Sequence, residues 1–339
     1  MIDILVIFIA ASLLLYVLLG GSDFGAGIIE LLPAGRLREA QREVINRAMG
    51  PVWEANHMWL ILLVVILFVG FPNIFTTLMI ALHFPMLALL VGIVVRGSAF
   101  VFRHYDAVQE VKTQRIYTAL FGLSSLWSAF WLGIIAASLN RGIIDPASQD
   151  VWDAWVAPWW GVYPLAMGAF VACIYAFLAS IYLVGETNSP VMKQRFIRLA
   201  GWGNVMVVLA GGLVFAASMG ERDSLPAAFL RDPLKLALVA MATLLFVVLW
   251  FFVAKRRTLL TRIVASGQVA LILAGWYLLY APNALITAKG PLSFYDQAAP
   301  PATLRQLVLA LLIGSAFIFP SLFYLFRVFK RSAGPKEQA

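Results

Sequence analysis

Long apolar runs separated by short polar stretches make up most of the chain. A helix needs about 20 mostly apolar residues to cross the hydrocarbon core of a bilayer. Nine stretches meet that standard, near residues 3–20, 54–71, 75–96, 117–139, 161–184, 200–219, 234–254, 263–281 and 306–326. Hydrocarbon offers backbone groups no hydrogen-bond partner, so each run predicts a helix, and the pattern lacks the alternation of barrel strands. The sequence therefore predicts an all-α polytopic protein with one membrane domain over residues 1–339 and no evident internal repeat.

Composition and charge support a membrane protein and predict its orientation. The chain is 62% hydrophobic and 12% charged with a mean hydropathy of +0.88, whereas soluble domains carry about a quarter charged residues. Most of the 25 Lys and Arg lie in alternate loops and the tail, at residues 36, 38, 42, 47, 96, 103, 112, 115, 193, 195, 198, 255, 256, 257, 262, 327, 330, 331 and 336. Because Lys and Arg collect on the cytoplasmic side, the N-terminus is predicted to be periplasmic and the C-terminus cytoplasmic. The net charge of +8 is spread over short loops, which does not indicate nucleic-acid binding.

Few ionisable residues lie near the predicted spans, and such residues tend to mark function. Asp23 follows the first span in the segment GGSDFGAG, Glu54 and His57 open the second, His83 lies in the middle of the third, and Arg96 closes it. The glycines around Asp23 allow tight turns and close helix approach. These five side chains are the first candidates for a functional site.

The segment MGPVWEANHMWL, at 49–60, concentrates this polar chemistry. Residues three apart share a helix face, so Glu54 and His57 could pair. Trp53 and Asn56 are also three apart and lie beside them. Trp59 falls on a different face. The alternative is an interfacial helix start, with an acid near the positive end of the helix dipole and indoles at headgroup level.

The histidines raise the question of haem. His57 and His83 are candidate axial ligands, but there is no C-x-x-C-H motif, and the single cysteine excludes a cysteine cluster. A stand-alone di-haem b-type cytochrome using these histidines stays open. A secondary transporter, with helix breaks at HFP (83–85) and WGVYP (160–164), is another alternative.

Four motifs carry a resemblance to subunit II of the cytochrome bd-type quinol oxidases. DFGAG at 23–27 resembles the family's glycine motif after the first helix, and GPVWEANHMWL at 50–60 resembles its Trp-Asp/Glu-x-Asn-x-x-Trp segment. RGSAFVFR at 96–103 resembles the end of its third helix, and YLVGET at 182–187 the end of its fifth. Together with the nine spans, the resemblance covers essentially the whole chain.

The resemblance implies a fold, a partner and cofactors. The expected fold is two four-helix bundles plus one peripheral helix. The expected complex is a heterodimer of the bacterial inner membrane, in which subunit I binds haem b, haem d and the quinol and reduces oxygen to water. This chain would ligate no haem iron and no metal, would stabilise subunit I, and would contribute to oxygen or proton access without turnover of its own. Small single-span accessory subunits and a structural quinone or lipid stay open.

The resemblance also assigns residues. Trp53, Glu54, Asn56, His57 and Asp23 match haem-proximal or proton-linked positions, and Trp59 and Arg96 match positions of an oxygen route. Two acids that the family often has are missing, because Gly20 and Val101 stand in their places. A proton relay needs titratable groups or water within hydrogen-bond reach. The sequence therefore favours an electrostatic and structural role for Glu54 over a relay.

Overall fold

The computed structural model describes residues 1–50, 53–105, 110–221 and 224–332. Pro51 and Val52 of the GPVWEANHMWL motif, and Lys336 of the charge pattern, lie outside these residues. The elements are α1 (Ile2–Leu15), the π-helical η1 (Tyr16–Gly20), α2 (Gly21–Leu31), the 3₁₀ turn η2 (Gly35–Leu37), α3 (Arg38–Met49), α4 (Trp53–Gly70), α5 (Pro72–Ala81), α6 (His83–Tyr105), α7 (Val111–Ser138), α8 (Val151–Trp155), α9 (Val162–Val184), α10 (Pro190–Ser218), α11 (Leu225–Arg231), α12 (Pro233–Ala254), α13 (Thr258–Tyr277), β1 (Asn283–Thr287), β2 (Gly290–Ser293) and α14 (Pro301–Ser332).

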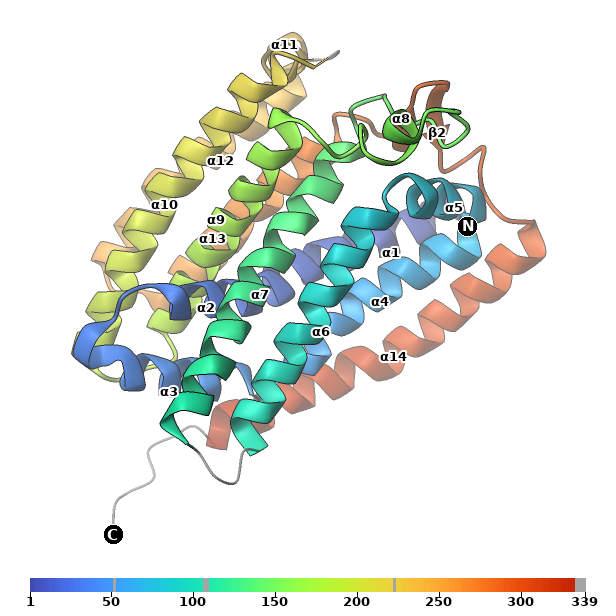
Figure 1. Cartoon of the computed structure of the whole chain (residues 1–339). Helices are drawn as coiled ribbons and strands as arrows, with labels where there is room; N and C mark the ends of the chain where they lie inside the picture. Colours follow the sequence, from blue (N-terminus) through green and yellow to red (C-terminus); the bar gives the residue numbers. More distant parts are fainter. Residues whose placement is uncertain (51–52, 106–109, 222–223, 333–339) are drawn as a thin grey trace.

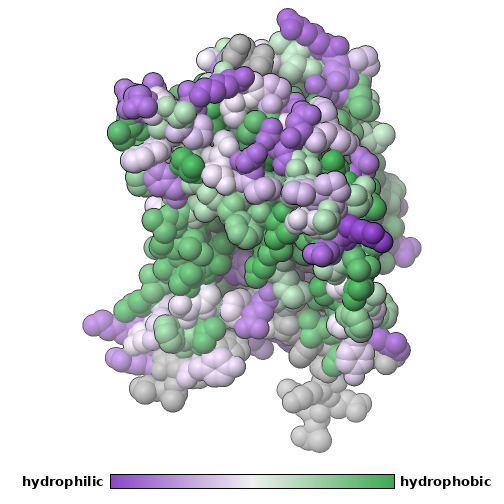
Figure 2. Space-filling model, turned by 90° about the vertical axis from the view of Figure 1, so that its right-hand side faces the viewer, coloured by the Kyte–Doolittle hydropathy of each residue, from purple (hydrophilic) through white to green (hydrophobic). Residues whose placement is uncertain are grey.

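Within the described residues, nine helical segments are long and apolar enough to span a membrane, which confirms the predicted number. They are Ile2–Leu31, Trp53–Gly70, His83–Arg103, Val111–Ser138, Val162–Val184, Pro190–Ser218, Pro233–Ala254, Thr258–Tyr277 and Pro301–Leu325. The space-filling view has a hydrophobic band across its middle with hydrophilic side chains above and below it (Figure 2). The start of α1 and the last described turn of α14 lie at opposite ends of the molecule, as an odd number of crossings requires (Figure 1). Which end is cytoplasmic stays a prediction.

The first span is longer than the 3–20 expected from hydropathy. The helix continues from α1 through η1 and α2 to Leu31, so Asp23 lies inside it rather than after it. Glycine explains how α2 stays helical among close neighbours: a Cβ on Gly25 would lie 1.8 Å from the carbonyl oxygen of Tyr175 on α9. The glycines of GGSDFGAG therefore allow close helix approach, and the segment is helical and forms no tight turn.

The apolar run at 75–96 is not one helix. It contains the end of α5, a break at Leu82, and the first half of α6, which begins at His83. His83 is therefore at a helix start instead of mid-span, where its Nδ1 lies 2.8 Å from the carbonyl oxygen of Ile80. Arg96 lies inside α6 and does not close it. The segments HFP and WGVYP both lie at helix starts rather than at breaks within a span.

Helix α9 lies at the centre of the larger group of helices. It packs against α2, α7, α10 and α13, while α6 packs on α7 and α12 on α13. On the other side, α4 packs against α1 and α14 (Figure 1). The end of the molecule at which the N-terminus lies carries α5, α8 and the antiparallel β1–β2 hairpin (Figure 1). The division into two four-helix bundles and a peripheral ninth helix stays a prediction.

Candidate functional site

Asp23 and Asn56 are brought together in the interior between α2 and α4. Both residues are 4% exposed. The Nδ2 of Asn56 donates a hydrogen bond of 2.6 Å to Oδ2 of Asp23. A carboxylate away from water needs such donors, because an unpaired buried charge is costly. The two motifs that supply these residues therefore form one polar contact, although 33 positions separate them.

A second contact joins His57 to Arg96. Arg96 is 1% exposed, its Nη1 lies 3.2 Å from Nε2 of His57, and its Nε donates to Oγ of Ser125 at 3.2 Å. The guanidinium carbon also lies 4.9 Å from the ring centre of Phe24 and 5.2 Å from that of Phe121. Aromatic faces attract cations, so these rings replace part of the lost hydration.

Glu54 and His57 do not form the pair that their spacing allowed. The His57 ring packs against Tyr16 and Phe24, with ring centres 6.0 and 5.6 Å away, and its Nε2 faces Arg96. Glu54 is exposed on the outer face of α4. The first turns of α4 therefore hold Asn56 and His57 inside the chain and present Glu54 outward.

The two tryptophans of the motif pack differently. Trp53 is partly buried, with its ring centre 5.5 Å from that of Phe100 on α6. Trp59 is 6% exposed and lies against Phe319 of α14 at 5.9 Å. Trp59 and Phe24, one of the two rings beside Arg96, belong to the same buried apolar cluster.

The sequence analysis missed Glu30 and Arg103 as a buried ion pair. Nη1 of Arg103 lies 2.6 Å from Oε2 of Glu30, with the two side chains 2% and 3% exposed. Nη2 of Arg103 donates to Oδ1 of Asn46 on α3 at 2.5 Å. A signal existed in the spacing: Glu30 follows Asp23 by seven positions, and Arg103 follows Arg96 by seven, which is about two helical turns.

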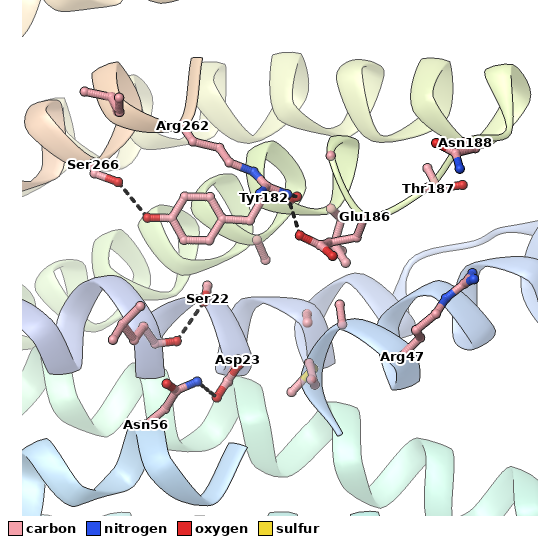
Figure 3. A pocket seen from close by; sticks show the side chains of 18 of the residues that line it. Ser22, Asp23, Arg47, Asn56, Tyr182, Glu186, Thr187, Asn188, Arg262 and Ser266 are labelled. Carbon is pink, nitrogen blue, oxygen red and sulfur yellow. Dashed lines mark hydrogen bonds and ion pairs between the residues drawn. The ribbon is translucent and has the colours of Figure 1, made fainter. Parts of the chain in front are cut away.

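A cavity of about 950 Å³ reaches this polar cluster. Ser22 and Asp23 of α2 and Asn56 of α4 line one side of it. Across the space lie Tyr182, Glu186, Arg262 and Ser266 (Figure 3). Arg47 and Asn188, at the end where the Lys- and Arg-rich loops gather, also line it. The buried Asp23 thus lies on the wall of a space that also reaches Arg47 and Asn188.

Comparison with known proteins places the chain in a family. The sequence profile of cytochrome bd terminal oxidase subunit II matches residues 1–329. The chain belongs to this family. It is 24% identical over 341 residues to a Bacillus subtilis (strain 168) protein named cytochrome bd ubiquinol oxidase subunit 2, covering 99% of this chain and 97% of that protein. A putative cytochrome bd menaquinol oxidase subunit II of the same organism is 21% identical over 340 residues, covering 94% of this chain and 92% of that protein.

The fold agrees with a solved structure of the same class. The bd oxidase from Geobacillus thermodenitrificans contains a chain that matches with a TM-score of 0.75 and 19% identity, covering 96% of this chain and 98% of that one. The predicted class is confirmed: this subunit II is a multi-pass protein of the bacterial inner membrane and part of an oxygen-reducing terminal oxidase complex. Membership in the family decides against the secondary transporter and the stand-alone di-haem cytochrome.

Proposed function

We propose that this chain is the subunit of a quinol-oxidising complex that ligates no haem iron, stabilises the haem-bearing subunit I, and admits protons from the cytoplasmic side. The names of the two Bacillus relatives refer to ubiquinol and menaquinol, which supports a quinol donor. Haem b, haem d and the quinol site belong to subunit I in this proposal. Quinol therefore reaches the complex through the partner.

The residues present do not fit a haem within this chain. His83 and Arg96 both lie on α6, and an α-helix rises about 1.5 Å per residue, so they are about 20 Å apart along the helix axis. Arg96 contacts His57, so His83 is far from His57 as well. Two histidines so far apart do not ligate one iron from opposite sides. Nε2 of His57 already faces a guanidinium at 3.2 Å, and no histidine is found among the described residues around the large cavity.

Contact with subunit I is proposed for the face of α4 that carries Glu54. A carboxylate on the outer surface of a membrane-spanning helix is expensive in lipid and tolerable against protein or buried water. Glu54 is exposed in this chain, and Trp53 packs beside it on Phe100. Glu54 then acts as an electrostatic neighbour of the partner's haem, and Trp53 fixes the start of the helix that presents it.

Proton access rests on one observation, the cavity of about 950 Å³ that ends at Asp23 and Asn56. This volume is far larger than the about 30 Å³ that one water occupies in the liquid. Water within the cavity can therefore carry protons to the buried carboxylate of Asp23. The 2.6 Å hydrogen bond from Asn56 orients that carboxylate at the cavity wall.

The two missing relay acids do not block this route. A Cβ on Gly20 would lie 3.0 Å from the ring of Tyr16, so an acidic side chain at position 20 would crowd a buried tyrosine. Val101 lies on α6 and is not part of the described cavity lining. The cavity reaches Asp23 without either position, so protons need no carboxylate there.

An oxygen route along Trp59 and Arg96 is supported by their surroundings. Trp59 shares an apolar cluster with Phe24, whose ring lies under the Arg96 guanidinium. Oxygen is apolar and partitions into such surroundings. We propose that oxygen passes these side chains on its way to subunit I.

The test of proton access is Asp23→Asn in the complete complex with subunit I. Asparagine keeps the shape and a hydrogen bond to Asn56 but cannot carry a proton. We expect quinol-driven oxygen uptake to fall by about 10²-fold, the size of a lost proton-transfer group, with haem content unchanged. Asp3→Asn, near the far end of the same helix, is the matched control. Full uptake in Asp23→Asn with normal haem content would reject proton access through this cavity.

A further inference from the structure

The YLVGET segment, residues 182–187, has a built arrangement of its own at the cavity. Nη2 of Arg262 on α13 donates to Oε1 of Glu186 at 2.7 Å and to the carbonyl oxygen of Tyr182. The hydroxyl groups of Tyr182 and Ser266 are hydrogen bonded at 2.6 Å. These contacts join the end of α9 to the first turns of α13 along one wall of the cavity (Figure 3).

Gly185 is needed for this arrangement. A Cβ at this position would lie 2.4 Å from Nη2 and 2.7 Å from Cζ of Arg262. The guanidinium therefore lies directly over the glycine, at the point where α9 ends. Any side chain at position 185 would push Arg262 away and release the Glu186 carboxylate from its position.

Glu186 and Asp23 are the two carboxylates among the described residues that line the cavity. They lie on opposite sides of the space (Figure 3). The Glu186 side chain is 33% exposed, whereas Asp23 is 4% exposed as a whole. One acid is therefore partly accessible at the surface of the chain, and the other is buried on the wall of the same cavity.

We propose that Glu186 collects protons at the cytoplasmic opening of the cavity and that Arg262, seated over Gly185, is its positioning residue. In the first step an O–H bond of hydronium or a buffer acid breaks, and an O–H bond forms on the Glu186 carboxylate. In the second step that proton passes to cavity water and on to Asp23, which restores the Glu186 carboxylate. Each step moves one proton and no electron, and oxygen reduction in the partner consumes the protons.

The inference rests on the proposed proton access, and its test separates the two. Glu186→Gln, Glu186→Asp and Gly185→Ala are made in the complete complex reconstituted in vesicles, with haem content measured on each preparation. Glu221→Gln is the matched control, because Glu221 forms a similar ion pair with Arg141, at 2.9 Å, near the opposite end of the molecule. Quinol-driven oxygen uptake is recorded from about pH 6 to about pH 9.

Without a collecting carboxylate, proton uptake depends directly on the free proton concentration. We expect uptake in Glu186→Gln to fall about tenfold per pH unit at the alkaline end, with haem content unchanged. Glu186→Asp should restore most of the rate, Gly185→Ala should show a weaker form of the same pH dependence, and Glu221→Gln should match the parent.

Other outcomes overturn the inference in distinguishable ways. A Glu186→Gln profile parallel to the parent, while Asp23→Asn is slow, rejects Glu186 as the collector and leaves proton access through the cavity standing. Parent-like profiles in both variants reject proton access and the inference together. A uniform loss of rate and haem in Glu186→Gln, with no change in pH dependence, assigns the ion pair a structural role only.

Discussion

The buried ion pair between Glu30 and Arg103 allows a quantitative prediction. The two side chains are 2% and 3% exposed, and their charged atoms lie 2.6 Å apart. Arg103 also bonds Asn46 on α3 and lies 4.8 Å from the ring centre of Phe121 on α7, so the pair joins four helices. Removing one partner of a dry pair leaves an uncompensated charge. Arg103→Met should therefore cost about 3–5 kcal/mol of stability.

The assay is denaturation of the purified complex, followed by haem release and by loss of helical signal. The double variant Glu30→Gln/Arg103→Met leaves no unpaired charge, so it should lose less stability than Arg103→Met alone, which also keeps the test informative if the single variant assembles poorly. Lys289→Met is the control, because its ion pair with Asp145 is 3.4 Å long and Lys289 is 71% exposed. A loss below about 1 kcal/mol in Arg103→Met, the size found for exposed pairs, would refute the dry ion pair.

Two further predictions concern helix packing and the partner face. Gly25→Ala should destabilise the complex by about 3 kcal/mol, because its Cβ would overlap the Tyr175 carbonyl oxygen; Gly212→Ala, where nothing lies within 4 Å, should be neutral in the same denaturation assay. Glu54→Gln should lower haem retention or shift a haem potential while Glu54→Asp is tolerated, as measured by haem content and redox titration. Unchanged haem and potential with abolished oxygen uptake would instead make Glu54 a proton relay.

Hydropathy predicted the number of spans and failed at two helix boundaries for physical reasons. The GGSDFGAG segment is too polar and glycine-rich to read as helix, yet α2 is held by packing against α7 and α9. The break at Leu82 is unmarked by charge, so one apolar run concealed α5 and the start of α6. Local composition reports whether a segment is apolar, but tertiary contacts decide where a helix continues.

The candidate site was predictable in its residues and not in its contacts. The motifs supplied Asp23, Asn56, His57 and Arg96, and the structure brings them together. The spacing of Glu54 and His57 suggested a pair within α4. The contacts of a side chain, however, also depend on the residues of neighbouring helices. His57 contacts Arg96 of α6 instead, which lies 39 positions further along the chain. The burial of Glu30 was not predicted, because a single acid at the end of an apolar run resembles an ordinary interfacial charge.

The two acids of α2 differ in a way that fits two roles. Glu30 is bound directly by the guanidinium of Arg103 and is not among the described residues around the cavity. Because it does not face the cavity, this carboxylate has no cavity water with which to exchange a proton, and it serves packing. Asp23, about two turns away, is bonded by the amide of Asn56 and lies on the cavity wall. An amide tolerates both the charged and the protonated carboxyl, since it can donate to one and accept from the other. The same helix thus carries one acid fixed for structure and, in our proposal, one free to exchange its proton.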